Sequence, residues 1–262
     1  MMKDSLILSD DYVFGVTLQG EGPFSNRRAI FLRLAMCNLT CIGYKSEGAP
    51  FGCDTFAQWN KKHEMTFEEL NTYFEIYNYI DALKDGVRLI ITGGEPLIQS
   101  ENLALWLNQF IAKYDLTNLD IDFETNGTIL PTKFMSTFNH DQFTGTINFI
   151  CCPKLSTNGD LKERRYKPDV LSWLNDYNCN KYESGIAAFK FVVNTGDDIS
   201  EIFENYIDNG IISREYCWLM PTAGSREELI ERSSKVADWC TKYGFNFSNR
   251  THIMIWDRKL RI

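Results

Sequence analysis

Three cysteines with irregular spacing, Cys37, Cys41 and Cys53, follow an apolar stretch at residues 30–36. Thiolates bind iron–sulfur clusters, and a cluster that only transfers electrons usually has four of them. Three thiolates leave one iron without a protein ligand, much as catalytic zinc keeps an open position. A second apolar run ends in Thr92-Gly93-Gly94-Glu95-Pro96, where the glycines allow a ligand to approach bare backbone. The two segments together indicate a cluster that binds and reduces a small molecule placed beside it.

A structural zinc site is the main alternative for the same cysteines. Together with His63 they would make a closed Cys3His site of the kind that zinc occupies in many proteins. The downstream Gly-Gly-Glu-Pro turn argues against it, because a structural zinc site has no use for such a turn. On spacing alone, a zinc-binding interaction domain without catalysis and cysteines without any ligand both stay open.

Alternating strands and helices must position these segments. Short apolar or β-branched runs bounded by turns predict six core strands, and helical spacing with caps predicts helices between them. The expected strands are 30–35, 87–91, 119–123, 146–150, 187–193 and 216–220, with a further extended stretch at 13–17. The expected helices are 66–84, opened by a capping box of Thr66 and Glu69, then 100–114, 199–209 and 226–243. Repeated strand–helix units imply a parallel sheet of the α/β class.

The chemically distinctive residues all follow predicted strands. In chain order they are Cys37 and its neighbours, Gly93-Gly94-Glu95, Glu124-Thr125-Asn126, Cys152-Pro153-Lys154 and Met220-Pro221. Ligands of α/β folds bind at the carboxyl ends of strands, so these segments predict one ligand site on one rim. Six strands are fewer than the eight of a closed barrel. We expect a single domain spanning residues 1–262.

Composition limits the possible partners and location. The formal net charge of -8 and the pI of about 5.0 argue against loose binding to a nucleic-acid backbone. The first residues lack the apolar core of a signal peptide, and no apolar run approaches the roughly twenty residues of a membrane span. We therefore expect a cytoplasmic protein without membrane contact. In such a protein the eight cysteines favour metal binding or burial over disulfides.

The combination of motifs resembles that of the radical S-adenosylmethionine (SAM) enzymes, and within them that of the 7-carboxy-7-deazaguanine synthases of queuosine and 7-deazapurine biosynthesis. The matching segments cover most of the chain: residues 17–22, 31–41, 53–55, 92–96, 124–127, 152–154 and 252–256. The usual superfamily spacing is Cys-x3-Cys-x2-Cys, but here Tyr44 takes the third position and an insert at about 42–52 precedes Cys53. Cys152 stands where the family usually has serine.

The resemblance implies an incomplete TIM-type β/α barrel with parallel strands, the radical SAM core. It also implies a [4Fe–4S] cluster held by Cys37, Cys41 and Cys53, with SAM bound at the open iron. The SAM-binding residues that it implies are Asp54, Gly93, Gly94, Glu95, Cys152, Pro153, Lys154, Met220 and Pro221. Glu95 would pair with the SAM ammonium group. An alternative for Cys151 and Cys152 is that they are buried thiols at a strand end.

The family's reaction converts 6-carboxy-5,6,7,8-tetrahydropterin to 7-carboxy-7-deazaguanine with loss of ammonia. A 5′-deoxyadenosyl radical abstracts hydrogen at C6 before the ring contracts. The substrate-binding residues implied here are Leu18, Gln19, Gly20, Glu21, Arg33, Thr92, His252 and, as the chain end, Ile262. Arg33 would pair with the substrate carboxylate in a bidentate geometry that lysine does not provide. Thr55 would bind Mg²⁺, which prefers oxygen ligands and retains several waters.

Two of these residues, Arg33 and His252, also have an interpretation without any substrate contact. Arg33 could be a surface arginine at a strand edge, although Leu32 and Leu34 should point to the opposite face and leave Arg33 inward with its neighbours Phe31 and Ala35. His252 could be a histidine of a surface strand.

The resemblance further implies an external one-electron reductant of the flavodoxin or ferredoxin type, and a homodimer. A second enzyme class remains, a radical SAM activase that makes a glycyl radical on a partner protein. The segments Gln19-Gly20-Glu21-Gly22 and Cys53-Asp54-Thr55 argue against that class.

Overall fold

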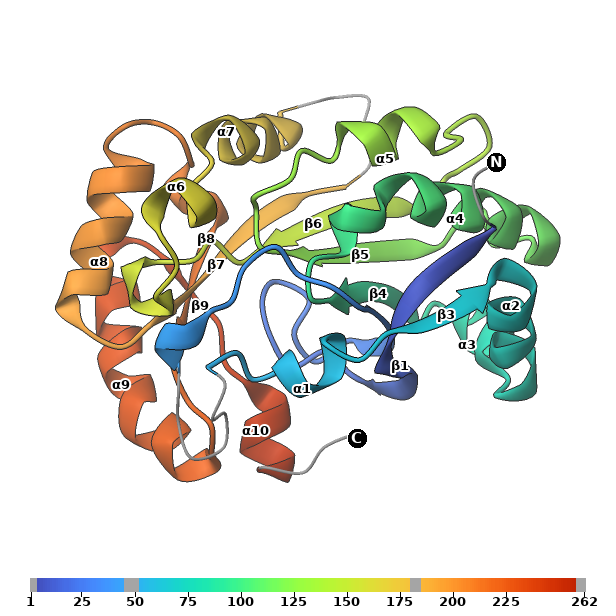
Figure 1. Cartoon of the computed structure of the whole chain (residues 1–262). Coiled ribbons are helices and arrows are strands. Elements are labelled where there is room, and N and C mark those ends of the chain that lie inside the picture. Colours follow the sequence, from blue (N-terminus) through green and yellow to red (C-terminus); the bar gives the residue numbers. More distant parts are fainter. Residues whose placement is uncertain (1–3, 45–51, 180–184, 258–262) are drawn as a thin grey trace.

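The part of the chain that the structure describes contains a nine-stranded sheet in the order β3-β1-β2-β4-β5-β6-β7-β8-β9 (Figure 1). The computed structural model describes residues 4–44, 52–179 and 185–257. The strands are β1 (Ser5–Leu18), β2 (Arg28–Leu34), β3 (His63–Thr66), β4 (Arg88–Gly93), β5 (Asp120–Thr125), β6 (Thr146–Cys151), β7 (Ala187–Val193), β8 (Cys217–Pro221) and β9 (Asn246–Phe247).

The six predicted core strands are β2 and β4 to β8, and each pairs in parallel with its neighbour. The α/β prediction is therefore confirmed. The short strand β9 extends the parallel part at one edge, whereas β1 and β3 add an antiparallel edge that the sequence did not predict. In the described part of the chain the order ends at β3 and β9, which do not pair, so the barrel is incomplete.

Most of the helices lie along the outside of the curved sheet (Figure 1). The described α-helices are α1 (Phe56–Trp59), α2 (Phe67–Ile76), α3 (Tyr79–Lys84), α4 (Ser100–Tyr114), α5 (Thr132–Thr137), α6 (Lys162–Arg165), α7 (Pro168–Tyr177), α8 (Gly196–Ile202), α9 (Arg226–Tyr243) and α10 (Thr251–Trp256). The described 3-10 turns are η1 (Ile42–Tyr44), η2 (Pro96–Gln99), η3 (Ser156–Asn158) and η5 (Arg214–Tyr216), and η4 (Phe203–Ile207) is a π-helical turn. None of the described helices combines the length and apolar character needed to cross a membrane.

Helices α4 and α9 have the predicted bounds, and Thr66 caps α2 through the predicted capping box with Glu69. Two helix predictions need correction. The helix expected to reach Lys84 breaks after Ile76, because Asn78 adopts a left-handed φ of 55° that a continuous helix cannot contain. The helix expected over 199–209 begins earlier, as α8, and continues into the π-helical turn η4.

The two faces of the parallel sheet differ in character, because successive side chains of a strand point to opposite faces. Outward residues such as Ile91, Phe123 and Phe149 are fully buried in the main apolar core under the helices. Inward residues near the carboxyl ends of the strands include Thr92, Glu124 and Lys190. Glu124 on β5 contacts Thr92 on the neighbouring β4 and Lys190 on β7, two strands away. The concave face is therefore polar where the sequence predicted a ligand site.

Candidate active site

Each cysteine of the predicted cluster site accepts an N–H hydrogen bond from a side chain of a different element. Asn126 Nδ2 donates to Cys37 Sγ at 3.8 Å, Asn158 Nδ2 to Cys41 Sγ at 3.3 Å and Trp59 Nε1 to Cys53 Sγ at 3.5 Å. The backbone N–H of Leu39 also donates to Cys37 Sγ at 3.5 Å. Donors of this kind are complementary to thiolate sulfurs, which bind iron–sulfur clusters.

The chain returns to Cys41 before it reaches Cys53. A Cβ added to Gly52 would lie 2.4 Å from the Cys41 carbonyl oxygen, so the two backbones are in direct contact there. Residues 45–51 of the insert lie outside the described residues. Burial raises the pKa of the Cys37 thiol and raises that of Cys41 to about 12, and the charge of Cys53 makes a smaller contribution to each of these increases. The three thiols thus share one neighbourhood, and this donor set fits a cluster bound by three thiolates.

The zinc alternative receives no support from the position of His63. This residue lies on β3 opposite Leu8 in the sheet register and stacks on Tyr12, with ring centroids 5.7 Å apart. Within the described residues, no three side chains of His, Cys, Asp or Glu are assembled as ligands of one metal ion.

Asp160 fixes the backbone between the first two cysteines. Its carboxylate accepts hydrogen bonds from the backbone N–H of Thr40 at 3.1 Å and of Cys41 at 2.8 Å, and from the Thr40 hydroxyl at 2.8 Å. Although burial raises the pKa of Asp160, these hydrogen bonds lower it overall and keep the acceptor ionised. Sequence reasoning missed Asp160 and its partner Asn158, and their position just beyond Cys152-Pro153-Lys154 was the available signal.

The two glycines of the Gly-Gly-Glu turn are required by the protein itself. A Cβ on Gly93 would lie 2.0 Å from the Leu34 carbonyl oxygen, and one on Gly94 would lie 2.1 Å from that of Met36. Their first explanation is therefore the close approach of the ends of β2 and β4. The role of this turn in SAM binding stays a prediction.

Glu95 is fully buried and its carboxylate is held by the protein. It accepts hydrogen bonds from the backbone N–H groups of Leu97 at 3.0 Å and Asn126 at 2.7 Å, and from the Thr125 hydroxyl at 2.9 Å. Burial raises the pKa of Glu95 to about 7 despite these donors. The carboxylate thus joins the strand ends of β4 and β5, and its predicted contact with SAM remains untested.

The other predicted SAM residues lie at the ends of β6 and β8. Cys152 Sγ accepts a hydrogen bond from Lys154 Nζ at 3.2 Å, and Met220 and Pro221 are buried at the end of β8. Pro153 is also buried. Cys151 is fully buried in the outer core, so the alternative of a buried thiol holds for Cys151, whereas Cys152 is half-buried. Burial raises the pKa of both Cys37 and Cys41, and the positive charge of Lys154 offsets part of that effect.

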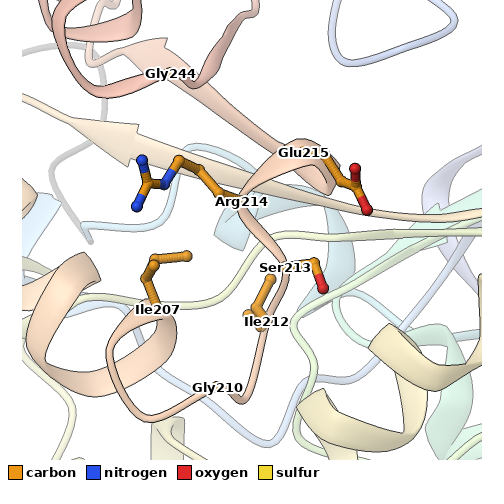
Figure 2. Close-up of a pocket in the computed structure, with 7 residues that line it drawn as sticks. All are labelled: Ile207, Gly210, Ile212, Ser213, Arg214, Glu215 and Gly244. Carbon is orange, nitrogen blue, oxygen red and sulfur yellow. The ribbon is translucent and has the colours of Figure 1, made fainter.

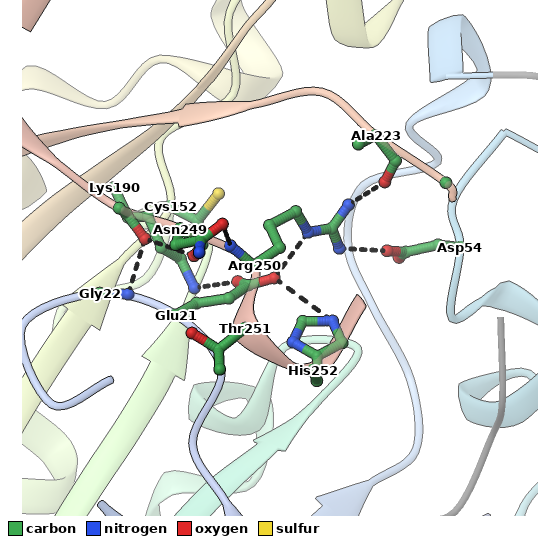
Figure 3. Close-up of polar contacts among 12 residues, drawn as sticks. Glu21, Gly22, Asp54, Cys152, Lys190, Ala223, Asn249, Arg250, Thr251 and His252 are labelled. Atoms are coloured by element: carbon green, nitrogen blue, oxygen red, sulfur yellow. Dashed lines mark hydrogen bonds and ion pairs between the residues drawn. The ribbon is translucent and has the colours of Figure 1, made fainter. Parts of the chain in front are cut away.

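Glu21 lies at the centre of an ion-pair network drawn from distant parts of the chain (Figure 3). Its carboxylate pairs with Lys190 Nζ at 2.6 Å and with Arg250 Nε at 2.9 Å, and lies 3.9 Å from His252 Nε2. Arg250 also lies 3.6 Å from Asp54, next to Cys53 in the chain. One arginine therefore links the 19–22 segment to the cysteine loop.

The network fixes the charge states of its members. Burial raises the pKa of Glu21, but attraction to Lys190 and Arg250 outweighs burial and lowers it far below its ordinary value. The pKa of Lys190 is raised, because attraction to Glu21 and Glu124 exceeds the effect of burial. Burial lowers the pKa of His252, so its imidazole is neutral at pH 7. Sequence reasoning missed Lys190 and Arg250, and neither belongs to a short motif.

Gln19 and Thr92 converge on Glu124. Gln19 Nε2 donates to one carboxylate oxygen at 3.0 Å and the Thr92 hydroxyl donates to the other at 3.2 Å. Arg33 is next to Thr92 in the β2–β4 register, and its guanidinium lies 5.5 Å from the Phe14 ring centroid. Arg33 is half-buried and lies on the face opposite Leu32 and Leu34, both fully buried, which is the orientation expected from the alternation.

The remaining predicted residues are Thr55, Leu18, His252 and Ile262. Thr55 occupies the N-cap position of α1 without a capping side-chain hydrogen bond, and its hydroxyl lies 3.4 Å from Cys53 Sγ, so the predicted Mg²⁺ ligand adjoins that thiol. Leu18 ends β1 and leads into the 19–22 segment. His252 lies in α10, which corrects the alternative of a surface strand. Ile262 lies outside the described residues.

Replacing Gly20 by alanine is expected to destabilise the protein by about 1–3 kcal/mol, the usual cost of overpacking. The new Cβ would lie 2.0 Å from His252 Nδ1 and 3.0 Å from the His252 backbone nitrogen, so α10 would have to move. Urea denaturation measures the change. Gly196→Ala is the control, because a Cβ there meets nothing within 4 Å. Equal stabilities of the two variants would contradict the close contact.

A pocket away from the candidate site lies at the amino-terminal end of β8 (Figure 2). It is lined by Ile207, Gly210, Ile212, Ser213, Arg214, Glu215 and Gly244. No predicted site residue belongs to it, and it lies at the opposite end of β8 from Met220 and Pro221.

Comparison with known proteins agrees with the fold described above. No family model matches the chain. The crystal structure of QueE from Escherichia coli shares the fold, with a TM-score of 0.58 and 19% sequence identity over 94% of this chain and 95% of that one. The neighbour thus shares an open α/β sheet of mostly parallel strands with this chain.

Sequence comparison narrows this fold class to a family. The chain is 31% identical to the 7-carboxy-7-deazaguanine synthase of Hyperthermus butylicus over 246 residues, 91% of this chain and 89% of the relative. It is 32% identical to that of Pyrobaculum aerophilum over 247 residues, 92% and 91% of the two chains. The chain belongs to the 7-carboxy-7-deazaguanine synthase family.

Proposed function

We propose that the protein converts 6-carboxy-5,6,7,8-tetrahydropterin to 7-carboxy-7-deazaguanine, with a [4Fe–4S] cluster and SAM as cofactors. The observation that carries this proposal is the physical link between two sites: Arg250 pairs with Glu21 of the 19–22 segment and with Asp54 beside Cys53. The cluster and SAM supply a radical that removes hydrogen from the substrate. The protein's own residues bind the substrate, orient it and pair with its charged groups.

The polar concave face supports the assignment of substrate contacts. Arg33 would pair with the substrate carboxylate, while Gln19, Thr92 and Glu124 offer hydrogen bonds to the pterin ring. Glu124 was not among the residues expected to bind substrate, and its contact with both other side chains adds it to the set. The neutral imidazole of His252 can donate or accept one hydrogen bond beside Glu21.

Further parts of the proposal rest on the sequence. Thr55 binds Mg²⁺ through its hydroxyl. An external one-electron carrier of the flavodoxin or ferredoxin type reduces the cluster, and the enzyme is a cytoplasmic homodimer. The eight cysteines, all without disulfides, support a reducing compartment. The one continuous sheet supports a single domain over residues 1–262.

Anaerobic reconstitution tests the function. The protein is loaded with iron and sulfide and then incubated with SAM, a strong reductant, Mg²⁺ and the carboxypterin. We expect both 5′-deoxyadenosine and 7-carboxy-7-deazaguanine among the products. Formation of 5′-deoxyadenosine without the deazapurine would refute the substrate, and bound zinc without acid-labile sulfide would refute the cluster.

Replacing Arg33 by lysine is expected to weaken substrate use far more than SAM binding. A guanidinium can make two parallel hydrogen bonds to a carboxylate, whereas the ammonium of lysine acts as a point charge. The loss of one charge-assisted hydrogen bond corresponds to about 1.5–3 kcal/mol, or roughly 10- to 150-fold in kcat/KM. Steady-state kinetics with the carboxypterin and equilibrium binding of SAM measure the two effects. Equal losses in both would assign Arg33 a purely structural role.

A further inference from the structure

We propose that Asn158 is a positioning residue that donates a hydrogen bond to the Cys41 thiolate and thereby raises the reduction potential of the cluster. This inference rests on the proposed function, because it requires the cluster held by Cys37, Cys41 and Cys53. It goes beyond that function by assigning a role to a residue that binds neither SAM nor substrate.

The hydrogen bonds of Asn158 determine which way its amide points. Its Oδ1 accepts the backbone N–H of Asp160 at 2.8 Å. Its Nδ2 lies 3.0 Å from an oxygen of the Asp160 carboxylate, which can only accept, and 3.3 Å from Cys41 Sγ. Exchanging the two amide atoms would place oxygen against the carboxylate and an amide donor against a backbone donor. The network therefore directs an N–H toward the sulfur.

The surroundings leave the amide little freedom. Asn158 is 0% exposed and Asp160 is 8% exposed. The turn η3 that carries Asn158 lies directly on the backbone that follows Cys41, because a Cβ on Gly43 would be 2.1 Å from the Thr157 carbonyl oxygen and one on Gly159 would be 2.8 Å from the Gly43 nitrogen. Asp160 holds the backbone N–H of Cys41 from the same side. The Asn158 amide and the Cys41 backbone are thus both held by Asp160.

Among the three side-chain N–H donors at the cysteines, Asn158 makes the shortest contact. Its 3.3 Å compares with 3.5 Å for Trp59 and 3.8 Å for Asn126. A hydrogen bond in a buried, low-dielectric site is electrostatically stronger than one in water. Reduction adds negative charge to the cluster and its sulfurs, so the donor stabilises the reduced form more than the oxidised form. Hydrogen bonds to the sulfurs are among the factors that set cluster potentials.

Two substitutions of similar size separate the hydrogen bond from packing. Asn158→Leu removes the donor, and Asn158→Asp replaces it with an oxygen that cannot donate when ionised. After reconstitution, the midpoint potential is measured by redox titration followed by electron paramagnetic resonance of the reduced cluster. We expect a more negative potential in both variants, because neither leaves an amide N–H against the sulfur.

Asn71→Leu is the matched control. Asn71 is a buried asparagine that accepts a hydrogen bond from Trp106 Nε1 in the helical layer, so its loss should lower thermal stability and leave the potential unchanged. Unchanged potentials in both Asn158 variants, at full iron and sulfide content, would overturn the inference. So would loss of the cluster from both, because Asn158 would then be only structural. Absence of a cluster from the unmodified protein would refute the proposed function instead.

Discussion

Replacing Cys53 by alanine is expected to reduce the formation of 5′-deoxyadenosine from SAM to the detection limit. The proposed site holds the cluster by three thiolates, so loss of one thiolate removes the cluster that reduces SAM. The same result is expected for Cys37→Ala and Cys41→Ala. Of the three, Cys53 provides the sharpest test, because it follows an insert and departs from the usual spacing. The contact between Gly52 and the Cys41 backbone supports Cys53 as the third ligand.

Anaerobic reconstitution followed by chromatography of the nucleoside measures this effect, with iron and acid-labile sulfide determined on the same samples. Cys179→Ala is the control, because this cysteine is exposed and far along the chain from the motif. It should retain both cluster and cleavage. Full SAM cleavage by Cys53→Ala would show that another residue completes the site.

Replacing Glu21 by glutamine is expected to lower the free energy of unfolding by about 3–5 kcal/mol, the usual cost of removing one partner from a buried ion pair. The side chains of Lys190 and Arg250 are only 5% and 15% exposed, so the variant would leave two cations without their main counter-charge. Turnover should also fall sharply, because Arg250 would lose the contact that aligns it with Asp54. Urea denaturation at pH 7 measures the stability change.

Glu75→Gln is the control for charge removal, because Glu75 pairs with Lys113 at the surface and such pairs contribute about 0–1 kcal/mol. The pH dependence gives a second check. The folded-state pKa of Glu21 is depressed, so its contribution is complete above the ordinary pKa of 4.5 and decreases as the pH falls below that value. The stability difference between wild type and Glu21→Gln should therefore shrink in acid, and a constant difference would contradict the ion-pair origin.

Local signals predicted much of the fold. The bounds of α4 and α9 and the capping box at Thr66 depend on neighbouring residues, which a single sequence displays. The break at Asn78 could not be predicted in this way, because no neighbouring residue in the sequence indicates that this asparagine adopts a left-handed conformation. The antiparallel edge formed by β1 and β3 was also missed, since it depends on pairing between residues far apart.

The candidate site divides in the same way. The cysteines and the Gly-Gly-Glu turn belong to short motifs and were found, and their positions at strand ends were confirmed. Lys190 and Arg250 contact Glu21 across separations of 169 and 229 residues, so only the folded chain brings them together. Gly93 and Gly94 were predicted to let a ligand approach the backbone, and that stays a prediction; the atoms nearest to a Cβ at either position are backbone atoms of the protein.

The segment around Gly20 takes its shape from the end of the chain. The backbone N–H of Thr251 donates to the Gly20 carbonyl oxygen, and the backbone N–H of Gly22 donates to the Ser248 hydroxyl, both at 2.8 Å. Substrate preference could therefore not be transplanted between relatives by grafting residues 19–22 alone. A working chimera would need both ends from the same parent, and natural sequences should change the two segments in concert.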